Sequence, residues 1–63
     1  MLIIGYKLGA DFNKATVSIS KNLGLTLHEA RNILDRVENG ESVSLENDFV
    51  LREDLVEYKF LVT

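Results

Sequence analysis

The junction "NLGLTLHEARNIL", at residues 22–34, restricts the fold of this chain more than any other stretch. Thr26 followed three residues later by Glu29 is the pattern of a capping box, in which each side chain binds the other residue's backbone amide at the start of a helix. Gly24 stands where a preceding helix commonly ends in a left-handed residue. Two helices, at residues 11–23 and 26–39, are therefore expected to meet in a tight bend.

The apolar residues on both sides of the bend recur with the helical period, so each helix has one face for a core. Three further segments, "LIIGYKL" at residues 2–8, "ESVSLE" at 41–46 and "EYKFLVT" at 57–63, show the short apolar or alternating patterns that predict strands. The helical stripes consist of Phe12, Ala15, Ile19 and Leu23 in the first helix and Leu27, Ala30, Ile33, Leu34 and Val37 in the second.

The segment "NDFVLREDLV", at residues 47–56, decides between two folds. A short helix capped by Asn47 or Asp48 would give a single α+β domain over residues 1–63, in the order β-α-α-β-α-β, with the helical hairpin packed on one face of a three-stranded sheet. A turn and strand would instead give a winged helix-turn-helix. We expect the first fold, with a core of Ile3, Ile4, Phe12, Ile19, Leu23, Leu27, Ala30, Leu34, Val43, Phe60 and Val62.

Composition bounds the chemistry that this chain can perform. There is no cysteine and only one histidine, His28, so one chain cannot assemble a thiolate or multi-histidine metal site. No serine has a general base at the spacing of a catalytic triad, and the glycines form no phosphate-binding loop. No segment has the run of about 18 apolar residues that a membrane span needs. We therefore expect a cytoplasmic protein that is not an enzyme, with no cofactor and no membrane contact.

The bend also resembles a known family, the C-terminal domain of the bacterial ribosomal stalk protein. That family carries a signature close to Gly-Leu-Gly-Leu-Lys-Glu-Ala-Lys followed by aliphatic residues, and this chain has Gly24 to Arg31 as "GLTLHEAR", followed by Ile33 and Leu34. The similarity is strongest over residues 13–37. It implies the β-α-α-β-α-β order, and a protein partner that docks on the outer face of the first helix with help from a basic residue on the second.

The helical wheel indicates such a face independently of the family resemblance. Val17 lies well away from the apolar stripe, with Lys14 three residues before it and Lys21 four residues after it. Arg31 matches the family's basic residue on the second helix. The partner-binding residues are thus predicted to be Lys14, Val17, Lys21 and Arg31.

Three departures from the family change the expected setting. Thr26 replaces a glycine, His28 replaces a lysine, and the first helix is about two residues shorter than the family's. The family's dimerisation region and linker are not among these 63 residues. We therefore expect a free-standing interaction domain, such as an accessory or phage-encoded modulator, that exists as a monomer or a weak homodimer.

A helix-turn-helix that binds DNA is the alternative function. Its exposed residues would be Thr26, His28, Arg31 and Asn32, with Arg31 suited to guanine and Asn32 to adenine. The charge of the chain counts against it, because the total is −3 and seven acidic residues lie after residue 37. A third possibility is that this acidic half imitates nucleic acid on some enzyme.

Overall fold

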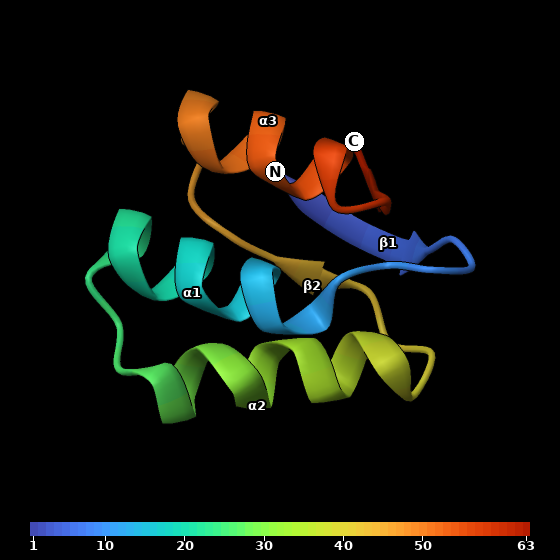
Figure 1. The fold of residues 1–63 in the computed structure, drawn as a ribbon, viewed down its shortest axis with the longest axis horizontal. Coiled ribbons are helices and arrows are strands. Elements are labelled where there is room, and N and C mark those ends of the chain that lie inside the picture. The colour runs from blue at the N-terminus through green and yellow to red at the C-terminus, as the bar shows by residue number, and fades with distance from the viewer.

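The computed structural model describes residues 1–63, and its order of elements confirms the expected α+β domain (Figure 1). The elements are β1 (Leu2–Tyr6), α1 (Phe12–Leu23), α2 (Leu27–Glu38), β2 (Val43–Ser44), α3 (Phe49–Glu57) and β3 (Phe60–Val62). Because residues 49–57 form a helix, the wing of a winged helix-turn-helix is not present. The alternative fold is therefore wrong.

The sheet has its first strand in the centre. The strand order is β2-β1-β3, and β1 pairs antiparallel with both neighbours, with Ile3 opposite Val43 on one side and Val62 on the other. α2 contacts β1 and β2, α3 contacts β3, and α1 packs against both of these helices. Ile3 is completely buried beneath the helices, whereas its neighbour Ile4 is 47% exposed. The helices therefore cover one face of the sheet.

The two helices of the hairpin begin and end where the sequence predicts. Asp11 caps α1 by accepting a hydrogen bond from the Lys14 amide at 2.9 Å, and Gly24 ends it with φ of 68°. Both bonds of the capping box form, with Thr26 Oγ1 accepting from the Glu29 amide at 3.0 Å and Glu29 Oε1 accepting from the Thr26 amide at 2.9 Å. These local bonds set the bend between α1 and α2.

The third helix is fixed by one cap and two buried leucines. Asp48 accepts a hydrogen bond from the Leu51 amide at 2.8 Å, which settles the choice between Asn47 and Asp48 as the cap. Leu51 and Leu55, four residues apart on one face, are completely buried. The helix then passes into β3 through Tyr58 and Lys59, and Lys59 has φ of 70°.

The core differs from the predicted list in both directions. Ala15 and Val37, which the sequence placed only in the helical stripes, are buried as well. Ile4 and Leu27 were expected to be buried and are 47% and 58% exposed, while Leu51 and Leu55 were not expected in the core. Ile4 lies at the irregular register between Ile3 and Gly5 and is on the uncovered face of the sheet. Leu27 is the first residue of α2, whose first turn extends beyond the strands in Figure 1, so no element covers it.

The other predicted core residues are buried or half-buried. Phe12, Leu23 and Val62 are half-buried and pack against the core. The completely or nearly completely buried apolar residues are Ile3, Ala15, Ile19, Ala30, Leu34, Val37, Val43, Leu51, Leu55 and Phe60.

Candidate protein-binding face of the helical hairpin

The outer face of α1 carries the three residues of that helix that were predicted to bind a partner. Val17 is 55% exposed, and Lys14 and Lys21 are both exposed. Counting about 100° per residue, all three fall within roughly 60° of one another on the helix surface. The structure therefore brings Lys14, Val17 and Lys21 together on one face, which we call the α1 face.

Packing on both sides of α1 leaves this face outward. On one side, Ser18 Oγ donates a hydrogen bond to Asp54 Oδ2 of α3 at 2.7 Å. On the other side, Ser20 Oγ donates to the Leu25 carbonyl at the bend, at 2.6 Å. The completely buried Ala15 and Ile19 point to the core. Val17 lies opposite this buried side, so its exposure follows from the way that α1 is held.

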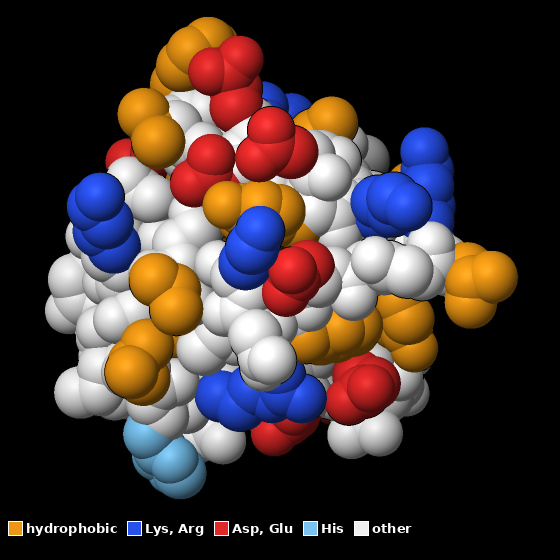
Figure 2. Space-filling view, viewed as in Figure 1, with side chains coloured by type: hydrophobic (Ala, Val, Ile, Leu, Met, Phe, Trp, Pro, Cys, Tyr) orange, Lys and Arg blue, Asp and Glu red, His pale blue; other side chains and the backbone are white.

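The two lysines of the α1 face form no ion pair within the chain. The chain has only two ion pairs, Arg31 with Asp35 and Arg36 with Glu41, so no carboxylate lies within 4.0 Å of the amine of Lys14 or Lys21. Figure 2 shows Lys, Arg and hydrophobic side chains interspersed over α1 and the neighbouring part of α2. An aliphatic centre between two unpaired cations is the result.

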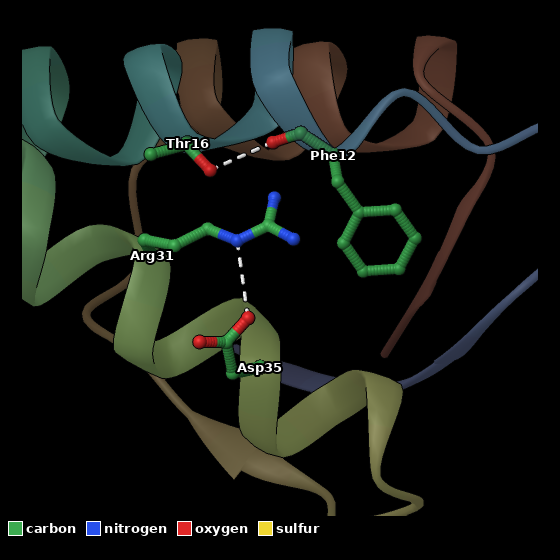
Figure 3. Close-up of polar contacts among 4 residues, drawn as sticks. All are labelled: Phe12, Thr16, Arg31 and Asp35. Carbon is green, nitrogen blue, oxygen red and sulfur yellow. Dashed lines mark hydrogen bonds and ion pairs between the residues drawn. The ribbon is translucent and has the colours of Figure 1, made fainter.

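Arg31, the fourth predicted residue, extends from α2 toward α1 and lies beside Phe12 and Asp35 (Figure 3). Its Nε donates a hydrogen bond to Asp35 Oδ1 at 3.0 Å, and its guanidinium carbon lies 5.6 Å from the centre of the Phe12 ring. The Arg31 side chain is still 40% exposed. An exposed pair of this kind contributes about 0.3–0.5 kcal/mol, and the cation–π contact about 0.5–1 kcal/mol. Arg31 is therefore oriented, and only part of its guanidinium is available to a partner.

The four residues of the DNA-binding alternative are placed less uniformly. His28 and Asn32 are exposed. The Thr26 hydroxyl accepts a hydrogen bond in the capping box, and Arg31 binds Asp35 and contacts the Phe12 ring.

The capping box also affects Glu29, because the hydrogen bond from the Thr26 backbone amide, with a smaller contribution from the Thr26 side chain, holds the pKa of the Glu29 carboxyl below its usual value of 4.5.

Leu27 belongs to the surface around this face, although the sequence assigned it to the core. It is 58% exposed and precedes Arg31 by about one helical turn in α2. The helical wheel gave no signal for this position, because Leu34 lies only about 20° from Leu27 around α2 and is completely buried. Leu27 is exposed because it is the first residue of the helix. Leu27 thus adds a second exposed aliphatic residue, one helical turn before Arg31.

The surface contains no pocket, and no group of three or more His, Cys, Asp or Glu side chains is arranged to hold a metal ion. None of the three helices has the length and apolar character needed to cross a bilayer.

No protein family, curated protein or solved structure matches this chain. The resemblance to the ribosomal stalk domain thus rests on the residues of the bend and stays a prediction.

Proposed function

We propose that this chain is a non-enzymatic interaction module that binds a protein partner through the α1 face, with Arg31 at its border. The observation that carries the proposal is a Val17 side chain that is 55% exposed between two lysines, neither of which has an acidic partner in the chain. A single exposed aliphatic residue is ordinary on a protein surface. Its position between two unpaired cations is what favours an interface.

The chemistry of the α1 face suits a rigid contact. Valine is branched at Cβ and has one strongly preferred rotamer in a helix, so burying Val17 costs little conformational entropy. The helix beneath it is held on both sides by hydrogen bonds to Asp54 and to the Leu25 carbonyl. A partner therefore meets a preformed surface and does not have to order it, which favours affinity.

The charges indicate what the partner presents. Lys14 and Lys21 are seven residues apart, which places them about 10 Å apart along the helix axis on either side of Val17. Carboxylates opposite both lysines would form charge-assisted hydrogen bonds and speed the encounter. We therefore expect an apolar patch flanked by acidic side chains on the partner.

The proposal is tested by capturing partners from a lysate of the cells that produce this protein. Three baits are compared: the wild type and two variants that each carry one substitution. The baits are the wild-type chain, Val17→Asp and Leu8→Asp. Leu8 is 98% exposed in the loop after β1, so Leu8→Asp introduces the same charge in place of an exposed aliphatic residue on a different surface. A partner of the α1 face is retained by the wild type and Leu8→Asp and is depleted about tenfold or more by Val17→Asp.

Two results would overturn the proposal. One is a captured partner that Val17→Asp retains as well as the wild type does. The other is a large loss of stability in Val17→Asp, because a surface substitution in this position should change the free energy of unfolding by no more than about 0.5 kcal/mol. Adding Lys14→Glu and Lys21→Glu to the panel separates the contribution of charge from that of Val17.

A further inference from the structure

The third helix carries apolar residues on several sides, and the chain covers only the side of Leu51 and Leu55. Val50, at 55% exposed, lies apart from both Phe49 and Val56 around the helix. Leu51 and Leu55 are completely buried against the rest of the domain, whereas Phe49 and Val56 are 74% and 58% exposed. A helix with apolar residues all round is normally buried. Figure 2 shows hydrophobic and acidic side chains next to one another over this helix, at the top of the view.

The exposed side of α3 has the spacing of a helix-packing stripe. Phe49, Arg52, Glu53 and Val56 follow one another at i, i+3, i+4 and i+7, so they lie within an arc of about 100°. We call these four residues the α3 stripe. It has one apolar residue at each end and one cation beside one anion in the middle.

This pattern is complementary to itself when it is reversed. In an antiparallel pair of α3 helices with a two-fold axis between positions 52 and 53, Phe49 meets the partner subunit's Val56 and Arg52 meets the partner subunit's Glu53. Each contact occurs twice, as a two-fold interface requires. We propose that the α3 stripe is the contact surface of a symmetric homodimer, and that a second copy of this chain is what covers the outer side of α3.

The charged pair in the middle of the stripe is free to make these contacts. Glu53 takes part in no ion pair within the chain, and no side-chain carboxylate lies within 4.0 Å of the Arg52 guanidinium. Arg52 uses one nitrogen, Nη2, to donate a hydrogen bond to the Thr63 main-chain oxygen at 2.9 Å. This bond holds the side chain in place and leaves the other guanidinium hydrogens for a carboxylate.

The same bond shows that the α3 stripe borders an open sheet edge. Thr63 directly follows β3, and the order β2-β1-β3 leaves β3 with a neighbour on one side only. The proposed contact can therefore continue from α3 to the edge of β3. A standard interface covers about 800 Å² of each partner, which would be about one fifth of the 3954 Å² surface of this chain. A nine-residue helix and a three-residue strand cover less than that, so we expect a weak, concentration-dependent dimer.

The dimer does not depend on the proposed function of the α1 face. α1 packs on the side of α3 that carries Asp54, and Asp54 lies roughly 150° around the helix from the centre of the α3 stripe. Val17 therefore remains exposed in the dimer. The Val17→Asp variant should dimerise like the wild type even if it no longer binds another protein.

Sedimentation velocity from about 10 µM to about 1 mM tests the proposal with two charge reversals. Arg52→Glu places two acids opposite two acids, and Glu53→Arg places two cations opposite two cations. Each variant alone should associate about tenfold or more weakly than the wild type. An equimolar mixture should associate again, because every charge of one variant then faces the opposite charge of the other.

Apolar variants keep the test independent of the Arg52–Thr63 bond. Phe49→Ser should also weaken the dimer, whereas the matched control Leu8→Ser, at a more exposed leucine on another surface, should not. Circular dichroism confirms that each variant is folded. A wild type that stays monomeric up to the highest concentration would overturn the proposal, as would a dimer that neither Phe49→Ser nor Glu53→Arg weakens. Folded reversal variants that fail to associate when mixed would refute the two-fold register.

Discussion

Replacing Lys59 by glycine should stabilise the protein, because Lys59 is the only residue other than glycine with a positive φ. Its φ of 70° lies in the left-handed region, which costs an L-residue about 1–2 kcal/mol. Glycine avoids this cost but loses about 0.5–1 kcal/mol more backbone entropy on folding. The difference is a gain of about 0.5–1 kcal/mol, which corresponds to a rise in Tm of about 2–8 °C for a domain of this size.

The assay is urea unfolding followed by far-UV circular dichroism, with Lys59→Ala as the matched control. Alanine removes the same amine but keeps Cβ, so Lys59→Ala should leave the free energy of unfolding nearly unchanged. The main-chain bonds of Lys59, from its amide to the Val56 carbonyl and from the Lys7 amide to its carbonyl, do not depend on the side chain. If Lys59→Ala gained as much stability as Lys59→Gly, or if neither gained any, the reasoning from backbone strain would be refuted.

Three further predictions concern the capping box and the core. Thr26→Ala should lower the free energy of unfolding by about 1 kcal/mol, while Thr26→Ser, which keeps the hydroxyl, should change it little; equal urea midpoints for both would contradict this. Because folding lowers the pKa of Glu29, its contribution to stability is present above pH 4.5 and is lost as the pH falls through the lowered value; Glu29→Gln should flatten this part of the curve of urea midpoint against pH. Leu55→Ala should cost about 2–5 kcal/mol and Leu27→Ala less than about 0.5 kcal/mol, and thermal melts that ranked them in the opposite order would show that the prediction from burial is wrong.

The hairpin could be predicted from sequence because its signals are local. Thr26 and Glu29 bind each other's backbone within one helical turn, and Gly24 supplies a backbone conformation that few other residues adopt. None of these bonds requires the rest of the domain. The exposure of Val17 followed equally directly, because a residue opposite the apolar stripe of an amphipathic helix faces outward.

The third helix could not be predicted in the same way. Its apolar residues lie on several sides, so the segment has no single helical period. Leu51 and Leu55 point inward, whereas Phe49, Val50 and Val56 are exposed. Whether it became a helix or a strand depended on packing against α1 and β3. The exposure of Leu27 also depended on the tertiary structure, because it follows from where the first turn of α2 ends relative to the sheet.

The contacts of Arg31 could be predicted from the sequence only in part. Its ion pair with Asp35 has the i, i+4 spacing that the sequence displays, and it could have been anticipated. The contact with the Phe12 ring could not, because it joins α1 to α2 and depends on how closely the two helices approach each other.

The measurement that tests the proposed function most directly is an assigned amide NMR spectrum of the isotope-labelled chain, titrated with the protein that the capture experiment retains. A partner of the α1 face should change the signals of residues 13–21 and of Arg31 and its neighbours, and should leave the α3 stripe unaffected. Changes confined to the α3 stripe or to the uncovered face of the sheet would contradict the proposal. A short DNA duplex added in place of the protein should change none of these signals, and salt-sensitive changes at residues 26–32 would favour the DNA-binding alternative.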